Sequence, residues 1–244
     1  MRPVLFRVRG FPIYSYPALL YLGLVGGIEG GSIAARAAGI DATRFQLALL
    51  LLLLPALIGA RLLYVVTHWP VYHQHRCRIW NSKEGGAAQY GGILVVLPLS
   101  GLVVPLLHLS WGSFWDAGAF SLLIGMVFGR IGCLLNGCCA GRGSSCALAV
   151  LLPNVRGIWA MRLPTQILEA VWAAALLVIA MVIRGQLPFR GALFWVIAAG
   201  YAAGRLVLES TRESAAGRFT VHHRVSAGLI VLSLAALLYE WPKF

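Results

Sequence analysis

Acidic residues are scarce in this sequence: Asp and Glu together number 8 in 244 residues, and all charged residues make up 11%. Soluble domains carry about 25% charged residues, so this composition excludes an ordinary soluble protein. Hydrophobic residues make up 59% of the chain. The sequence also lacks a polar stretch long enough for a soluble domain, an internal repeat and a low-complexity linker. We therefore expect a single membrane domain over residues 1–244.

A basic patch interleaved with aromatic residues is also missing. The formal net charge is +12, but the basic residues are scattered through the loops between apolar segments. This distribution argues against nucleic acid as a partner. Phospholipid headgroups are the anions that a membrane protein meets, and they fit the charge better.

Long apolar segments dominate what the sequence does contain. A spanning helix needs about 20 mostly apolar residues, and seven segments approach this length. We predict an all-α, polytopic integral membrane protein with about seven transmembrane helices around a lipid-accessible polar cavity. The expected spans are Pro17–Ala38, Gln46–Thr67, Tyr90–His108, Ala117–Leu135, Pro164–Ile183, Gly191–Ser210 and Val225–Trp241.

The loops differ in charge on the two sides of the membrane. Twelve lysines and arginines fall in the loops on the N-terminal side, five on the opposite side and three within spans. The positive-inside rule alone would place the N-terminus in the cytoplasm. A face that binds lipid phosphate also collects arginine, so the charge count leaves the orientation open.

The stretch Gly129–Gly141 follows an apolar run and places Arg130 at the edge of the membrane. A guanidinium in hydrocarbon costs at least about 2.5–3.5 kcal/mol, so it needs a partner or a water-filled cavity. Cys133, Cys138 and Cys139 follow closely. The first two would lie about 140° apart on a continued helix, although Gly137 is expected to end it. With Cys146, their spacing matches no usual structural zinc pattern, and we predict no metal and no cofactor.

Two further groups of polar residues lie at span ends. Gln166 and Glu169 are three residues apart and share a helix face, which suggests a cavity wall. Arg205, Glu209 and Arg212 also share a face. They are compatible with an ion pair that locks helices together, or with Arg205 and Arg130 jointly facing a phosphate, for which an arginine fork is well suited.

Several other features allow two interpretations each. Tyr90 lies among paired glycines (Gly85, Gly86, Gly91 and Gly92), which favours a functional phenol over an interfacial-belt tyrosine. Arg61 suits either a cavity wall or a side chain that reaches the interface. Asp116 suits a helix N-cap before the fourth span.

Two more sites have a structural interpretation that we favour. Glu29 stands among glycines of the first span, which indicates close helix packing, with the carboxylate paired to an arginine. The loop with His68, His73, His75 and Cys77 has no matched second cluster, so it is more consistent with a solvated surface than with a metal site.

These stretches together resemble the prolipoprotein diacylglyceryl transferase family. Arg130 and Asn136 match its signature, and Asp116 falls at the family's spacing before it. The remaining matches occur in the family's order. They are Tyr16, Gly59-Ala60-Arg61, the glycines around Tyr90, Pro164-Thr165-Gln166 with Glu169, and Arg205 with Glu209 and Arg212. The similarity covers nearly the whole chain.

The resemblance implies a transferase of the bacterial cytoplasmic (inner) membrane, with its cavity and N-terminus on the outer side. Family members move a diacylglyceryl group from phosphatidylglycerol to the thiol of a prolipoprotein's lipobox cysteine. By this likeness Arg130, Arg205 and Tyr90 would be catalytic, with the two arginines neutralising the departing phosphate. The substrate would be bound by Tyr16, Arg61, Asn136, Gln166, Glu169, Glu209 and Arg212.

The chain departs from the family's pattern at several polar positions. Tyr90 and Leu163 stand where histidines are usual, and Cys133 and Cys138 replace Asn and Glu of the signature. Two alternatives therefore remain open. One is a phospholipid-dependent transferase with another acceptor, in which Cys133, Cys138 or Cys139 supplies a thiolate favoured by Arg130 and Arg142. The other is a lipid-binding or redox-sensing protein without catalytic activity.

Overall fold

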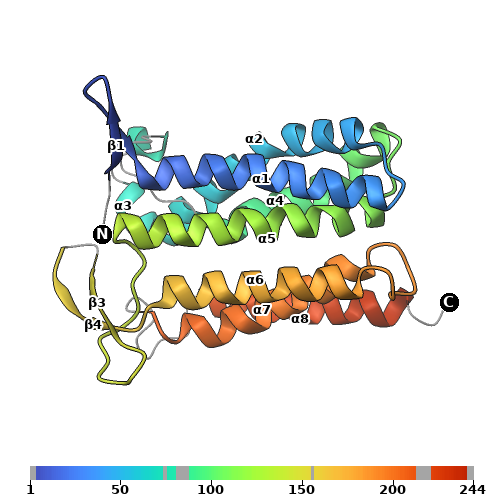
Figure 1. Cartoon of the computed structure of the whole chain (residues 1–244). Helices are drawn as coiled ribbons and strands as arrows, with labels where there is room; N and C mark the ends of the chain where they lie inside the picture. Colours follow the sequence, from blue (N-terminus) through green and yellow to red (C-terminus); the bar gives the residue numbers. More distant parts are fainter. Residues whose placement is uncertain (1–3, 74–75, 81–87, 155–156, 213–220, 241–244) are drawn as a thin grey trace.

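A computed structural model describes residues 4–73, 76–80, 88–154, 157–212 and 221–240, and Figure 1 shows them as a bundle of long, roughly parallel helices. The long helices are α1 (Ser15–Ala37), α2 (Ala42–Thr67), α4 (Gln89–Leu106), α5 (Trp111–Asn136), α6 (Thr165–Ile183), α7 (Ala192–Glu209) and α8 (Val221–Glu240). A helix satisfies its own backbone hydrogen bonds, which is why apolar segments take this form in lipid.

Six of these helices are long and apolar enough to cross a membrane, and Tyr90–Leu106 is a shorter apolar helix. The all-α, multi-pass prediction is therefore confirmed. The last helix begins at Val221, one turn before the expected start.

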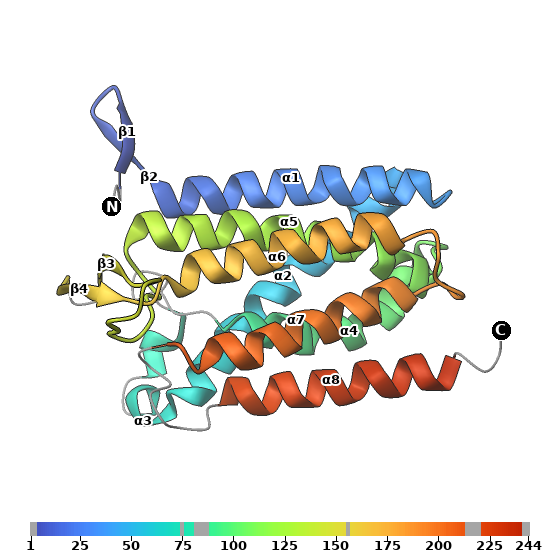
Figure 2. The same cartoon turned by 60° about the horizontal axis from the view of Figure 1, so that its bottom comes forward.

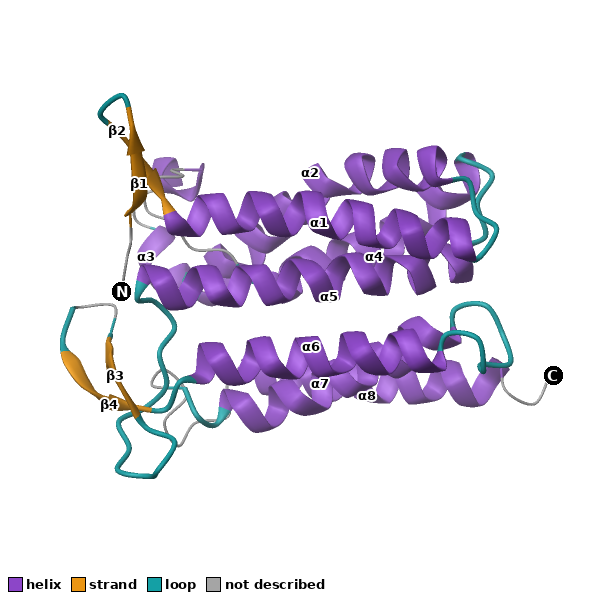
Figure 3. Ribbon diagram, in the orientation of Figure 1, coloured by secondary structure: helices purple, strands orange, loops and turns teal. Residues whose placement is uncertain are grey.

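Short elements sit at one end of the bundle (Figure 3). They are the hairpin of β1 (Val4–Val8) and β2 (Phe11–Tyr14), the helical turns α3 (Trp69–Tyr72) and η1 (Arg76–Trp80), and the hairpin of β3 (Val150–Pro153) and β4 (Trp159–Arg162). Both hairpins are antiparallel, and neither was predicted from the sequence. We call this end, where α5 and α7 finish and α6 and α8 begin, the hairpin end. The other is the turn end, where α6 turns into α7 (Figure 2).

Small residues set the closest helix contacts. The glycines of α1 face Ser121 and Gly125 of α5, so the expected close packing is confirmed. Glu29 itself is exposed, and it pairs with no described residue, so the expected arginine partner is not found there.

Gly91 of α4 packs on Gly59 of α2, where an added Cβ would lie 2.2 Å from the Gly59 carbonyl oxygen. The small size of Gly91 therefore admits another helix. Gly85 and Gly86 lie outside the described residues.

An aromatic core fills the turn end. Trp111 and Trp115 each donate an indole N–H to the Ser100 hydroxyl at 2.9 Å, and Phe194 packs on Trp115 with ring centroids 4.6 Å apart. Both tryptophans belong to α5, which begins at Trp111, whereas hydropathy predicted a span beginning at Ala117.

Candidate functional site

One carboxylate at the hairpin end is held by three arginines. Glu169, in the second turn of α6, pairs with Arg130 of α5, Nε to Oε2 at 2.7 Å. Arg212, just after α7, reaches both carboxylate oxygens through Nη2, at 2.8 and 3.0 Å. Arg205 of α7 also pairs with Glu169. The arginines that the sequence placed far apart therefore meet at a single point.

A second carboxylate completes this ion-pair cluster. Glu209 lies one turn after Arg205 and pairs with its Nη2 at 2.8 Å and with the Arg212 Nε at 3.4 Å. The side chains of Glu169 and Glu209 are only 5% and 2% exposed. Three guanidinium groups thus face two carboxylates, and one positive charge is left over in a buried place.

The loop after α5 fixes the geometry of the cluster by joining α6 to α7. Gly141 N–H donates to the Leu163 carbonyl at 3.0 Å, just before α6, and Arg142 N–H donates to the Thr211 carbonyl at 2.8 Å, just after α7. Thr165 and Thr211 share a hydrogen bond between their hydroxyls at 3.0 Å. These bonds hold the ends of the two helices at the spacing that lets their charged residues meet.

Three thiols lie beside the ion-pair cluster. The Sγ atoms of Cys133, Cys138 and Cys139 all lie within 4.8 Å of one another. Hydrogen bonds from the other two thiols lower the pKa of the Cys139 thiol, against the effect of burial, and Arg212 and Arg130 lower it further.

Two predicted substrate-binding residues border these thiols. Gln166 is buried, and its Nε2 donates to the Cys138 carbonyl at 2.7 Å, while its Oε1 has no hydrogen-bond partner among the described residues. Asn136 is exposed at the end of α5 and lies beside the Cys138 thiol.

The two predicted tyrosines come from different helices and lie near different groups of the site. Tyr16 of α1 is half-buried beside the thiols and Arg130, with its ring on Gly132. Tyr90 of α4 is 3% exposed, which excludes an exposed belt tyrosine. Its hydroxyl is hydrogen-bonded to Ser226 of α8, with 2.5 Å between the oxygens.

Three further residues of this region were not predicted from the sequence. His222 lies with its ring centroid 5.9 Å from that of Tyr90 and near Glu209 and Arg205. Ser226 follows it by one turn, and Tyr201 lies near Tyr90 and Arg130. Tyr201 stands one turn before Arg205, and that spacing could have revealed it. Nothing in the sequence indicates that α8 packs against Tyr90.

Two other predicted residues act elsewhere. Arg61 donates from Nε to the Ile79 carbonyl at 2.7 Å and from Nη2 to that of Arg78 at 3.2 Å, so it fixes η1. The prediction that Asp116 is the N-cap of its own helix is wrong, because α5 already begins at Trp111. Its carboxylate instead caps α7, where it accepts from the N–H groups of Gly191 at 2.7 Å and Phe194 at 2.9 Å.

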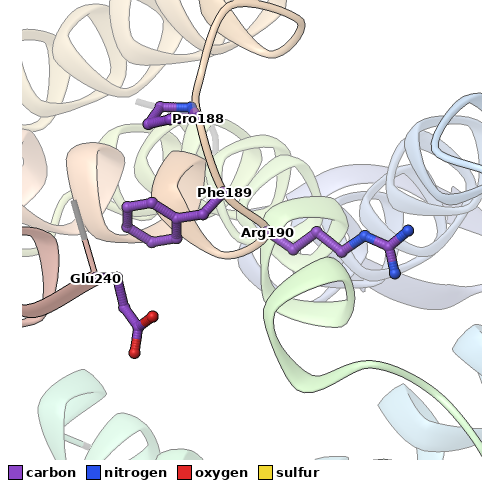
Figure 4. Close-up of a pocket in the computed structure, with 4 residues that line it drawn as sticks. All are labelled: Pro188, Phe189, Arg190 and Glu240. Atoms are coloured by element: carbon purple, nitrogen blue, oxygen red, sulfur yellow. The ribbon is translucent and has the colours of Figure 1, made fainter. Parts of the chain in front are cut away.

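A cavity of about 410 Å³ lies at the turn end, away from the ion-pair cluster. Figure 4 shows Phe189 on the same side of the chain as Glu240, while Arg190 extends the other way. Pro188 completes the lining. The cavity brings together no set of groups comparable to the ion-pair cluster.

At the hairpin end, His68 and His73 are exposed and His75 lies outside the described residues.

Comparison with known proteins matches residues 3–239 to the family model described as prolipoprotein diacylglyceryl transferase. Among curated proteins, the chain is 26% identical over 241 residues to the phosphatidylglycerol–prolipoprotein diacylglyceryl transferase of Bacillus cytotoxicus, covering 93% of this chain and 88% of that protein. It is 27% identical over 246 residues to the protein of the same name from Clostridium kluyveri, covering 98% and 96%.

Proposed function

The chain belongs to the prolipoprotein diacylglyceryl transferase family, and we propose that it is the transferase its relatives' names describe. It would move a diacylglyceryl group from phosphatidylglycerol to the thiol of a prolipoprotein cysteine, the lipobox cysteine. We place it in the bacterial inner membrane with the hairpin end on the outer side, from its family membership and its apolar helices.

The observation that carries the proposal is the convergence of Arg130 and Arg205 on Glu169. Two guanidinium groups that reach the same carboxylate are also spaced to reach two oxygens of one phosphate. Arginine forks bind carboxylates and phosphates in the same geometry. Phosphatidylglycerol would enter the cluster by exchanging its phosphate for some of the contacts that Glu169 now makes.

The charge of the cluster suits the reaction. The acceptor thiolate attacks the glyceryl carbon, and the bond between that carbon and the phosphate oxygen breaks. Glycerol phosphate leaves with the electron pair, so negative charge grows on the leaving oxygen. The unbalanced positive charge of the cluster is buried beside that oxygen, where it stabilises the transition state more than it would in water.

The other residues then have distinct tasks. The unpartnered Oε1 of Gln166 can accept a hydrogen bond from a headgroup hydroxyl, and Asn136 and Tyr16 would orient the headgroup from the exposed side. Glu209 and Arg212 hold Arg205 and Glu169 in place. Tyr90, with Ser226 and His222 behind it, would exchange protons with the reacting groups. Arg61 would act on the lipid only through η1.

Purified protein incubated with phosphatidylglycerol and a lipobox peptide tests the proposal. We expect the peptide to gain one diacylglyceryl group by mass spectrometry and an equal amount of glycerol phosphate to be released. A peptide with serine in place of the cysteine is the control. If the phospholipid is consumed while the peptide stays unmodified, the acceptor is another molecule. If neither changes, the chain is not a transferase of this lipid.

A further inference from the structure

The proposed function leaves the three clustered thiols without a task. Cys133 is buried, and Cys138 and Cys139 are half-buried, whereas Cys77 and Cys146 are exposed and lie outside the cluster. The cluster adjoins the phosphate-binding arginines, since Cys139 lies within electrostatic range of Arg130 and Arg212.

The backbone is shaped to bring the first two thiols together. α5 ends in a Schellman motif, in which the Cys138 N–H donates to the Cys133 carbonyl at 3.1 Å and the Gly137 N–H to the Leu134 carbonyl at 3.2 Å. Gly137 supplies the left-handed conformation with φ of 74°. This motif places the side chains at the two positions held by Cys133 and Cys138 in contact, which a continued helix would not do.

The third thiol joins them through an unusual backbone conformation. Cys139 has φ of 62°, a left-handed value that non-glycine residues rarely adopt and that persists only where the surrounding structure holds it. The bond from Gln166 to the Cys138 carbonyl, at 2.7 Å, helps to hold this turn. Strain of this kind gathers at functional sites.

Three converging sulfurs form a metal-binding donor set. A zinc ion holds cysteine sulfur at about 2.3 Å, so two sulfurs of a tetrahedral site lie about 3.8 Å apart. The Sγ atoms already lie within 4.8 Å of one another, and small side-chain rotations would close the site. A disulfide would use only two of the three. Thiolates select zinc or copper(I) over the harder cations.

We propose that Cys133, Cys138 and Cys139 bind one Zn²⁺ ion, whose fourth position takes the thiol of the acceptor. The binding of the acceptor thiol at the fourth position rests on the proposed function. A metal-bound thiol is deprotonated, so the zinc ion would hold the acceptor sulfur as a thiolate, the nucleophile of the reaction, beside the phosphate.

The chemical step balances without an oxidant or a reductant. The acceptor thiol binds zinc and releases its proton to water. Its sulfur then forms a bond to the glyceryl carbon of the phospholipid, and the carbon–oxygen bond to phosphate breaks. The electron pair stays on the oxygen of the departing glycerol phosphate, held by Arg130 and Arg205. The thioether product is a weaker ligand than the thiolate and leaves the metal.

Elemental analysis of the purified full chain tests the site without turnover. We expect about one zinc ion per chain in the wild type and in the control variants Cys77→Ser and Cys146→Ser. Cys133→Ser, Cys138→Ser and Cys139→Ser should each lose at least about tenfold in bound zinc, because two thiolates remain. Cys139→His offers an imidazole ligand and should keep the metal, which separates ligation from misfolding.

Cobalt substitution tests the fourth position. Co²⁺ in place of zinc gives visible absorption bands of a tetrahedral thiolate site, and these should shift when a lipobox peptide is added but not when its serine analogue is added.

Three results would overturn the proposed zinc site: a wild type without metal, a zinc content of Cys139→Ser equal to that of the wild type, or a mass that shows a disulfide among the three cysteines. An unchanged cobalt spectrum overturns the acceptor role. Absent peptide lipidation with normal zinc content would instead count against the proposed function alone.

Discussion

The two ends of the bundle each hold a carboxylate between helices, half-buried at the turn end and buried at the hairpin end, and they hold it in different ways. At the turn end, Asp116 accepts hydrogen bonds from the backbone N–H groups of Gly191 and Phe194. At the hairpin end, Glu169 is held by side chains of three arginines. Backbone groups cannot turn to another partner, whereas guanidinium groups can. The Asp116 carboxylate therefore joins α5 to α7, and in our proposal the Glu169 carboxylate occupies the place that the phosphate would take.

Neutralising Glu169 should have the largest effect on stability. Glu169→Gln leaves three largely buried guanidinium groups with the single carboxylate of Glu209, and loss of a buried partner costs about 3–5 kcal/mol. We expect this drop in the free energy of unfolding in detergent, and partial recovery when phosphatidylglycerol is added. Glu240→Gln at the turn end is the control. Unchanged stability would show that Glu169 does not balance the arginines.

Removal of either converging arginine should have the largest effect on catalysis. If these arginines hold the leaving phosphate as proposed, Arg130→Ala and Arg205→Ala each remove one donor to it, and we expect kcat to fall by about 10²–10³-fold. The exposed Arg184→Ala is the matched control. Initial rates of peptide lipidation, normalised to folded protein, measure the effect. Rates within about twofold of the wild type would exclude transition-state stabilisation by these groups.

Asp116→Asn should separate structure from catalysis. The amide oxygen can still accept one of the two backbone bonds, so we expect a loss of about 1–3 kcal/mol in the free energy of unfolding. The kcat of the folded fraction should stay unchanged, because Asp116 lies at the opposite end from the arginines. A fall in kcat as large as that of Arg205→Ala would remove the distinction between the two ends.

The smallest effect is expected for Arg61→Lys. A lysine can keep one of the two bonds to the carbonyls of η1, so we expect about 1 kcal/mol lower stability and a small change in KM for phosphatidylglycerol. A large increase in KM would mean that Arg61 binds the lipid itself.

The sequence was sufficient for the fold class and for the family. Apolar segments of spanning length and the ordered set of polar residues carry that information locally. Arg205, Glu209 and Arg212 were placed on one face by helical periodicity, and the structure joins all three in one cluster.

Contacts between distant segments could not be predicted in the same way. Periodicity does not show which helices pack together, so the partnership of Tyr90 with Ser226 and that of Asp116 with α7 were missed. The thiol cluster depends on the left-handed residues Gly137 and Cys139. Gly137 signalled the end of a helix, but no sequence signal marks a cysteine for that conformation.

The most direct test of the central claim is a single assay of three proteins: the wild type, Arg205→Ala and Asp116→Asn. Each is incubated with phosphatidylglycerol vesicles and a lipobox peptide, and the lipidated peptide is measured per folded chain. We expect a rate about 10²–10³-fold lower for Arg205→Ala and a rate equal to the wild type for Asp116→Asn. Equal losses in both variants, or no loss in Arg205→Ala, would contradict a catalytic role for the arginines.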